Sequence, residues 1–299
     1  MVEAFHPAFA DLVALDAEVE VLARGLRFLE GPVWLAHEHA LLVNDINGDC
    51  CYRWTEDERL SVQRSPTGMA NGMTLDRDGR VIVCEHATSR LSRIERDGRE
   101  VVLCDRFGGK QLNSPNDVVV HSSGSIYFTD PPYGRQAEHG IERIQELEFQ
   151  GIFRHDGTSG TEPELLDASL HRPNGLSFSL DESRLYVADT RAMKVWSLPV
   201  AADGRLGAPR HLATLDGTFD ETLGFPDGLK VDERGNLWVT GPRGIWVLSP
   251  AGDPLGRIIT GRPTCNFTWG GNDGLDVFCA SHDQLGRVRV RVRRAPQPG

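Results

Sequence analysis

The chain has 299 residues, of which 39% are hydrophobic and 25% are charged, and its formal net charge is −11 at pH 7. Such a composition is typical of a globular protein with a sizeable core and excludes a disordered chain. The acidic balance argues against a nucleic-acid partner, because binding to nucleic acid needs a basic face. It is compatible with a cation as ligand.

Cysteine spacing and the N-terminal sequence bear on the compartment. The six cysteines are spread along the chain without a CxxC pair or a zinc spacing, and two of them, Cys84 and Cys279, lie inside strand-like runs. We therefore expect free thiols. The N-terminus lacks the basic and apolar regions of a signal peptide, and no stretch approaches the ~20 apolar residues of a membrane span. We expect a cytoplasmic protein without a membrane partner.

Short β-rich runs dominate the sequence in chain order, and most are bounded by a turn signal. They cover residues 41–46, 80–86, 125–131, 184–190, 236–242 and 275–281. The runs recur at intervals of roughly 40 to 60 residues, and four-stranded propeller blades take about 40–50 residues. The longest interval contains an insertion, residues 135–149, with room for one helical turn.

This recurrence predicts an all-β fold, a six-bladed β-propeller of four-stranded blades around a central channel. The propeller is expected as a single domain over residues 1–299, with a short N-terminal extension of about residues 1–20. The alternative is a β-sandwich with irregular loops, but a sandwich does not predict a unit of this length that recurs.

A short polar phrase precedes a strand in three units: SPND at 114–117, RPNG at 172–175 and FPDG at 225–228. Each phrase by itself is a turn sequence, since Pro fixes φ and Asn or Gly tolerates positive φ. Similar turns at 70–73 and 265–267 indicate a structural use in other units. The first unit places Glu30, in EGPVW, at the equivalent position.

Equivalent positions of propeller blades converge on the central channel, so Glu30, Asn116, Asn174 and Asp227 are expected to face one point. Two carboxylates and two amide oxygens suit a hard divalent cation. Ca²⁺ fits this set best, Mg²⁺ or Mn²⁺ is an alternative, and Zn²⁺ is less favoured by the ligand types. Without an ion, the two carboxylates would repel each other and shift in pKa.

The segments 110–134, EGPVW and 172–190 together resemble the SMP-30/gluconolactonase/luciferin-regenerating family, and most closely its bacterial gluconolactonases. The resemblance implies a six-bladed propeller with a catalytic divalent cation, often calcium, in the channel. It maps the ligands onto Glu30, Asn116, Asn174 and Asp227. It also implies a small-molecule lactone substrate and a gluconolactonase that converts D-glucono-1,5-lactone to gluconate.

Lactone hydrolysis needs a polarised carbonyl and an activated water. Asp227 is expected to act as both ligand and general base, with Glu30 or hydroxide on the cation as alternatives. Asn116 is expected to contact substrate hydroxyls as well as the ion. Animal members of the family have a sugar-binding arginine where this chain has Ser114, so other substrate-binding residues are needed: Lys110, Tyr133 and His86 are the nearby ones.

Other functions remain open at this point. The same metal site suits hydrolysis of other lactones or of phosphoesters, as in a diisopropylfluorophosphatase-like enzyme. A non-catalytic propeller used as an interaction platform, with a structural ion, is the second alternative. Nucleophile-elbow, HExxH and P-loop motifs are absent from the sequence. The strand-ending Asp45, Asp130 and Asp189 are expected to bond to turns, and nothing in the sequence indicates an oligomeric state.

Overall fold

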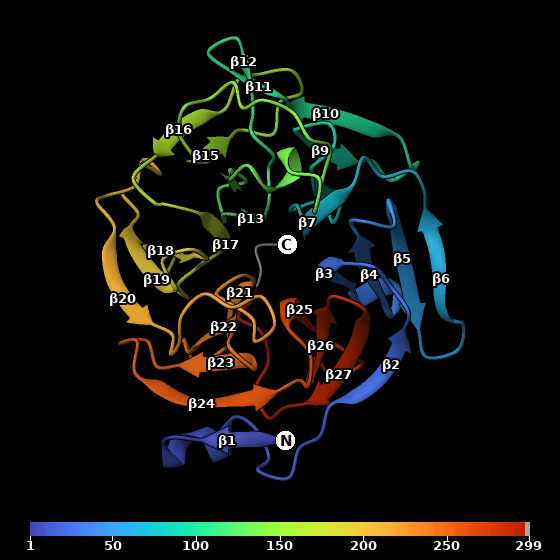
Figure 1. Cartoon of the computed structure of the whole chain (residues 1–299), viewed down its shortest axis with the longest axis vertical. Coiled ribbons are helices and arrows are strands. Elements are labelled where there is room, and N and C mark those ends of the chain that lie inside the picture. Colours follow the sequence, from blue (N-terminus) through green and yellow to red (C-terminus); the bar gives the residue numbers. More distant parts are fainter. Residues whose placement is uncertain (297–299) are drawn as a thin grey trace.

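Six antiparallel sheets surround a central axis in the computed structural model, which describes residues 1–296 (Figure 1). From the inside outwards, the first three blades consist of β3 (Leu29–Leu35), β4 (Ala40–Asp45), β5 (Cys50–Thr55) and β6 (Arg59–Arg64); β7 (Ala70–Leu75), β8 (Val81–Glu85), β9 (Arg90–Ile94) and β10 (Glu100–Cys104); and β13 (Val118–Val120), β14 (Ile126–Asp130), β15 (Gly151–His155) and β16 (Glu164–Asp167).

The last three blades consist of β17 (Pro173–Phe178), β18 (Arg184–Asp189), β19 (Lys194–Pro199) and β20 (Arg210–Thr214); β21 (Leu229–Val231), β22 (Leu237–Gly241), β23 (Gly244–Leu248) and β24 (Pro254–Ile259); and β25 (Thr264–Gly270), β26 (Asp276–Ser281), β27 (Gln284–Arg289) and β2 (Glu20–Arg24). The expected six-bladed propeller of four-stranded blades is confirmed. The six β-rich runs of the sequence form the second strand of each blade.

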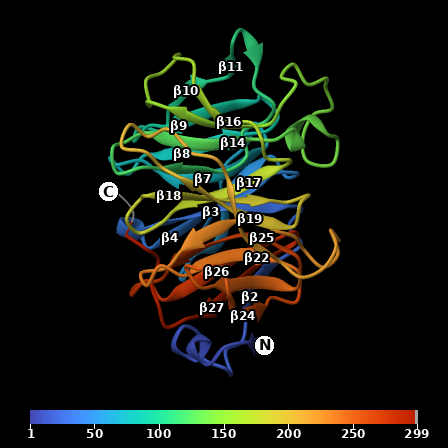
Figure 2. The same ribbon diagram turned by 90° about the vertical axis from the view of Figure 1, so that its left-hand side faces the viewer.

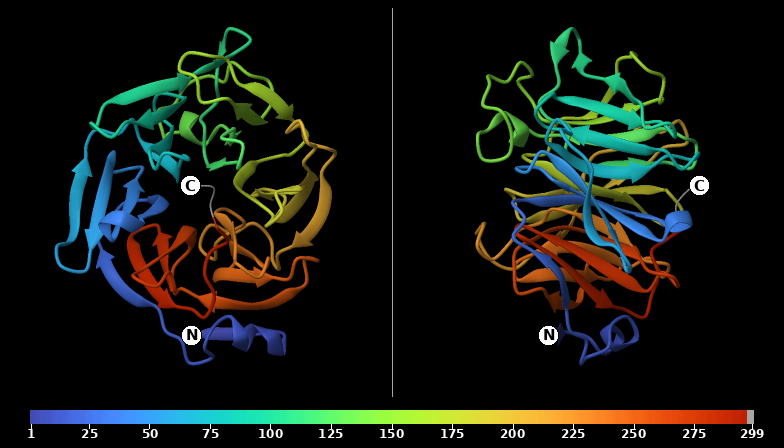
Figure 3. Two further views of the ribbon diagram at one scale, coloured as in Figure 1. Left: turned by 180° about the vertical axis from the view of Figure 1, so that it is seen from behind. Right: turned by 90° about the vertical axis from the view of Figure 1, so that its right-hand side faces the viewer.

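These second strands are buried on both faces because each blade packs between two others. β4, β14 and β22 are buried at every residue, which explains why they read as continuous apolar runs. The core lies between blades: the ring of Phe278 on β26 packs against Trp54 on β5, with 5.1 Å between centroids. The stacked sheets are seen edge-on in Figure 2 and from behind in Figure 3. All six cysteines are buried and free, as expected.

The N-terminal segment closes the ring. β2 pairs with β27 at the outer edge of the sixth blade, so the first and last parts of the chain share one sheet. β1 (Val2–Ala4) adds a fifth strand to the blade of β24. The 3-10 helix η1 (Pro7–Asp11) inserts Phe9 into the core beside this blade. Residues 2–24 are therefore packed on the propeller.

The insertion in the third blade covers one end of the channel. The helical turn expected within residues 135–149 is not found: the 3-10 helix η3 (Tyr133–Arg135) reaches only the first residue of the insertion, and residues 136–150 form no strand or helix. Arg135 Nε donates to Asn113 O at 2.7 Å, and Arg143 Nη2 donates to His86 O at 2.7 Å. The buried Arg135 and the partly buried Arg143 fix the insertion against the second and third blades.

Two smaller elements lie away from the channel. The hairpin of β11 (Arg106–Phe107) and β12 (Lys110–Gln111) projects from the rim in Figure 1. The 3-10 helix η2 (Ala36–Glu38) joins β3 to β4. Within residues 1–296, no helix has the length and apolar character needed to cross a membrane.

Candidate active site

Five residues that lie in or just before the inner strands of five consecutive blades meet around a cavity of about 40 Å³ on the propeller axis. They are Glu30, Asn71, Asn116, Asn174 and Asp227, and all five are buried. The strand register shifts between Glu30 and Val33, and again at the same place in β7 and β17. Such bulges bend a strand and turn a side chain out of the pleat, and here the turned side chains face the axis.

A glycine follows four of the five ring residues, all but Asn116, and permits this close approach. A Cβ on Gly31 would lie 2.0 Å from the backbone oxygen of Asn71, and one on Gly175 would lie 2.1 Å from that of Asp227. The backbone of Gly72 donates a hydrogen bond to Asn116 O at 2.9 Å. Adjacent inner strands therefore touch, and the Asn-Gly and Asp-Gly sequences are needed for packing as well as for the turn.

The two carboxylates of the ring are electrostatically strained. The oxygen atoms of Glu30 and Asp227 and the sulfur of Cys265 lie within 4.8 Å of one another. Burial, followed by the charge of Asp117, raises the pKa of Glu30 to about 7. Burial, followed by the charge of Glu30, raises the pKa of Asp227 well above its usual range. Each carboxylate therefore disfavours the charged form of the other.

The amide groups of the ring are oriented by their neighbours. His86 Nδ1 lies 2.9 Å from His139 O, which can only accept, so this nitrogen carries the proton. Its Nε2 then accepts from Asn71 Nδ2 at 2.9 Å. Thr190 Oγ1 donates to Pro226 O and accepts from Asn174 Nδ2 at 3.0 Å. Both amide nitrogens are thus occupied, and the oxygens are left as acceptors.

A buried polar layer supports the ring from the far side. Asn266 Nδ2 donates to Glu30 Oε2 at 3.0 Å, and its Oδ1 accepts from Lys230 Nζ at 3.2 Å. Lys230 Nζ also lies 3.8 Å from Asp117 Oδ2. Burial lowers the pKa of Arg294 to about 10, an effect that the charge of Asp117 opposes. Asp117 thus has two cationic neighbours.

The ring fits a hard divalent cation. Asn174 Oδ1 is buried without a hydrogen-bond partner in the described residues. Glu30 and Asp227 form no ion pair with a side chain of residues 1–296. A buried acceptor and two mutually repelling carboxylates are satisfied together by a cation that binds oxygen. The thiol of Cys265, the softer member of the cluster, has a pKa that burial raises well above its usual range.

A larger pocket leads to the ring. It has a volume of about 590 Å³ and shares Phe28, Tyr133, His139 and Phe225 with the ring cavity. Its volume is that of a small-molecule site, whereas the ring cavity has space for an ion or a few atoms only. The insertion of the third blade forms one wall of this pocket through residues 135–142.

Most of the expected site residues come together here. Glu30, Asn116, Asn174, Asp227, Tyr133 and His86 all line the ring cavity. His86 is neutral, because burial lowers its pKa to about 4, and both of its nitrogens are occupied within the protein. It supports Asn71 and has no free nitrogen for a substrate. Lys110 is exposed on β12, and neither the ring cavity nor the pocket above it includes this residue among its walls.

The sequence interpretation missed three contributors. Asn71 and Asn266 belong to turns that we expected to be structural, yet one lines the cavity and the other bonds to Glu30. Cys265 precedes Asn266 and lies against the carboxylates. The matching position of the turn in every unit is the signal that could have identified them.

The strand-ending aspartates are structural, as expected. Asp45 accepts from the backbone of Arg27 and Phe28, and Asp130 accepts from Asn113 and Ser114. Asp189 does the same for residues 171–172. In each blade this aspartate holds the loop that leads to the inner strand. Ser114 has a similar role, since its Oγ donates to Pro131 O and accepts from Gly134 N.

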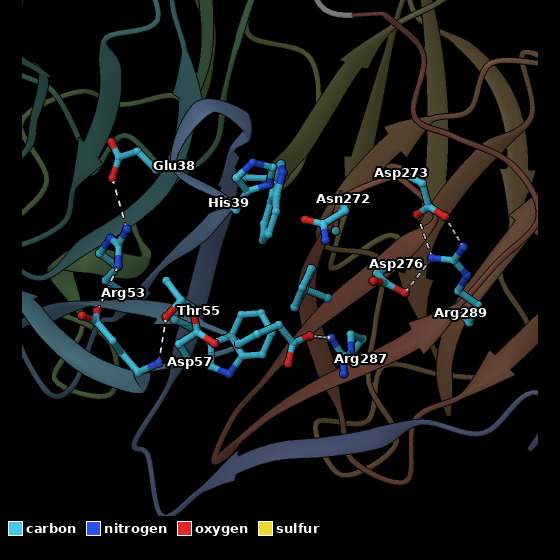
Figure 4. A pocket seen from close by; sticks show the side chains of 16 residues that line it. Glu38, His39, Arg53, Thr55, Asp57, Asn272, Asp273, Asp276, Arg287 and Arg289 are labelled. Atoms are coloured by element: carbon cyan, nitrogen blue, oxygen red, sulfur yellow. Dashed lines mark hydrogen bonds and ion pairs between the residues drawn. The ribbon is translucent and has the colours of Figure 1, made fainter.

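Another pocket, of about 920 Å³, lies elsewhere, between the outer parts of the first and sixth blades (Figure 4). Its charged side chains are largely paired with one another. Arg289 pairs with Asp273 and Asp276, and Arg53 pairs with Glu38. Exposed pairs of this kind contribute little energy and leave little unpaired charge for a ligand. The ring cavity remains the best candidate for chemistry.

Several known proteins of similar sequence and structure are named as lactonases. A gluconolactonase of Zymomonas mobilis is 32% identical over 310 residues, covering 96% of this chain and 85% of that protein. The pentonolactonase XacC of Haloferax volcanii is 27% identical, covering 85% and 81%. The structure of a gluconolactonase from Xanthomonas campestris superimposes with a TM-score of 0.88 at 31% identity, covering 97% of this chain and 94% of that one.

A family model described as the SMP-30/gluconolactonase/LRE-like region matches residues 28–283, a span that runs from Phe28 beside Glu30 through the sixth blade. The matched region contains every residue of the ring. The resemblance seen in the sequence is therefore confirmed, and the chain belongs to the SMP-30/gluconolactonase/LRE-like family.

Proposed function

We propose that this protein is a lactonase that hydrolyses sugar lactones, D-glucono-1,5-lactone first among them, with a divalent cation held in the channel. One observation carries the proposal. Two buried carboxylates and an unpartnered amide oxygen face one small cavity, which opens into a pocket large enough for a small molecule. The lactonase relatives support a hydrolase that acts on lactone esters.

Glu30, Asn116, Asn174 and Asp227 would hold the cation, and Ca²⁺ suits this set of oxygen ligands best. When bound, the cation would supply Lewis-acid polarisation of the lactone carbonyl. Asn71 is the fifth residue that lines the cavity. Its amide nitrogen is bonded to His86, so its amide oxygen is left as a further acceptor for the cation.

Asp227 is the proposed general base. Its carboxylate lies in the ring cavity, and a bound cation would keep it deprotonated, which is the form that a general base needs. It would take a proton from the attacking water and return it to the alcohol that leaves when the ring opens. Glu30 is kept in place by its hydrogen bonds from Gly31 N and Asn266 Nδ2, so it is less free to exchange a proton.

A pH-indicator assay of D-glucono-1,5-lactone hydrolysis tests the proposal. The purified protein would be treated with EDTA and then supplied with Ca²⁺, Mg²⁺, Mn²⁺ or Zn²⁺, one at a time. We expect turnover only with a cation, and loss of turnover in Glu30→Gln. A protein that does not exceed the spontaneous rate with any cation would reject this substrate. Undiminished turnover in a folded Asp227→Ala variant would reject the assigned base.

A further inference from the structure

Two polar side chains beside the ring cavity lack the partners that their burial requires. The hydroxyl of Tyr133 and the Nε and Nη1 atoms of Arg172 are buried without a hydrogen bond to any described residue. The guanidinium carbon of Arg172 lies 5.6 Å from the centre of the Tyr133 ring, within the range of a cation–π contact. Arg172 is not a lining residue of the ring cavity or of the pocket above it, so it bears on the channel through Tyr133.

We propose that Tyr133 binds a hydroxyl group on the carbon atom next to the lactone carbonyl, and that Arg172 holds the Tyr133 ring in position for this contact. The proposal rests on the proposed lactonase function and deepens it, because it makes the protein selective for 2-hydroxy lactones over lactones without this hydroxyl.

The place of Tyr133 supports the assignment. Tyr133 lines both the 40 Å³ ring cavity and the 590 Å³ pocket above it, so it lies at their junction. A lactone whose carbonyl reaches the ring carboxylates must leave the rest of its ring in the pocket, because the ring cavity is too small for it. The substituent next to the carbonyl then passes the junction, which Tyr133 lines.

The chemistry of Tyr133 suits a neutral hydrogen-bond donor. Burial raises its pKa to about 12, and the charge of Asp227 adds to the effect, while Thr190 and the cationic Arg172 oppose it. The phenol therefore keeps its proton at neutral pH. Thr190 already donates to Pro226 O and accepts from Asn174, so its own hydrogen is not available to Tyr133.

The unpaired hydroxyl gives selectivity a physical basis. A buried polar group left without a partner carries the full cost of its lost hydration. A substrate hydroxyl that pairs with Tyr133 removes this cost, whereas a substrate lacking the hydroxyl leaves the cost in place. Sites built around a substrate hydroxyl discriminate strongly against the analogue without it, for this reason.

The test compares D-glucono-1,5-lactone with 2-deoxy-D-glucono-1,5-lactone, using the cation-loaded wild-type protein and its variants. We expect the wild type to prefer the 2-hydroxy lactone by roughly tenfold or more in kcat/KM. Tyr133→Phe should reduce this preference to about threefold or less, chiefly through KM for the 2-hydroxy lactone, with turnover of the 2-deoxy lactone retained. Tyr127→Phe is the matched control, because its hydroxyl donates to Gly204 O outside the channel.

The Arg172 variants test its positioning role. Arg172→Gln should raise KM for the 2-hydroxy lactone and leave kcat within about twofold, whereas Arg172→Lys, which keeps the cation, should recover part of the affinity. Arg205→Gln removes a guanidinium from an exposed pair with Asp203 and should change neither constant. Calorimetric titration with gluconate gives a second measure: Tyr133→Phe should bind it roughly tenfold more weakly.

The failures are distinguishable. A wild type that hydrolyses neither lactone would overturn the proposed function. A wild type that hydrolyses both lactones with nearly equal kcat/KM would overturn this inference but leave the proposed lactonase function standing. This outcome can be read from the wild-type protein without any variant. Equal losses on both substrates in a folded Tyr133→Phe protein would also overturn it, because they would assign the tyrosine a purely structural role.

Discussion

The raised pKa of Glu30 predicts how stability depends on pH when the cation is removed. Glu30 titrates at an ordinary pKa of 4.5 in the unfolded chain and at about 7 in the folded, cation-free protein. Between these values the folded protein holds a proton that the unfolded chain has released. Stability contributed by the protonated form is therefore complete below pH 4.5 and is lost as pH rises through 7.

The magnitude follows from the size of the shift. One pKa unit corresponds to about 1.4 kcal/mol, so the loss is on the order of 3 kcal/mol. An unfolding entropy of ~2 cal/mol/K per residue over 299 residues converts this into a fall in Tm of about 5 °C. A bound cation would remove the cost, since it favours the charged carboxylate.

Thermal unfolding of the EDTA-treated protein from pH 5 to pH 8 measures the effect, with Glu30→Gln as reference. The substituted amide keeps an oxygen that can accept from Gly31 N and Asn266 Nδ2 but does not titrate. The wild type should lose about 5 °C relative to this variant across the range. Adding Ca²⁺ should restore the wild type at pH 8 and have little effect at pH 5.

The reasoning would be refuted if the plots of Tm against pH for the wild type and for Glu30→Gln ran parallel. If the EDTA-treated wild type and Glu30→Gln differ by the same Tm at every pH, Glu30 does not titrate in this range. The carboxylates would then be balanced by groups within the protein, and the main argument for a cation in the ring would be lost.

Three further predictions concern the ring and its support. Asp227→Asn should lower kcat by about 10²–10⁴-fold, the usual contribution of a general base, and circular dichroism should show an intact fold. Gly175→Ala places a Cβ 2.1 Å from Asp227 O, so it should destabilise the protein by roughly 1–3 kcal/mol in urea unfolding and lower cation affinity, measured by calorimetry. Lys230→Met leaves Asp117 with only Arg294 as a cationic neighbour, so it should lower the free energy of unfolding at pH 8 by about 3–5 kcal/mol. A much smaller loss at this pH would mean that Lys230 does not balance the charge of Asp117.

The architecture could be predicted because each blade repeats one pattern. The second strand of every blade is buried on both faces, so its apolar run appears at the same place in each unit. The closure of the ring by β2 gave no comparable signal, because β2 is an edge strand whose first two residues are exposed. Its partner β27 lies more than 250 residues away, and pairing at this distance leaves no local pattern.

The ring could be predicted only in part, for a physical reason. Glu30, Asn116, Asn174 and Asp227 were found as polar residues that precede a strand at equivalent positions. Asn71 was set aside because Asn-Gly is also a common turn, and a turn sequence cannot show which way its amide points. That direction is set by His86, fifteen residues later, through a hydrogen bond across the strand pair.

Lys110 is the opposite case: we expected it at the site, but it lies outside the ring cavity and the pocket above it. It lies six residues before Asn116 in sequence, and we expected it near the substrate for that reason. The β11–β12 hairpin carries it outwards to the rim, because the chain between two blades must return from the outer strand to the inner one. Nearness in sequence therefore indicates nearness in space only within the inner strand.

The distribution of charge along the channel indicates from which end of the channel a cation would reach the ring. Arg294 and Ala295, from the C-terminal segment, pair with the backbone of Asp232 and Val231 beside the inner strand β21. On this side Lys230 and Arg294 balance Asp117, so a cation gains little from binding there. On the other side Glu30 and Asp227 form no direct ion pair with a side chain of residues 1–296, and the charge of Lys230 only partly opposes the rise in their pKa values. A cation and a lactone are therefore expected to reach the ring from the same pocket, which places the substrate carbonyl on the side where the carboxylates and the Tyr133 hydroxyl lie.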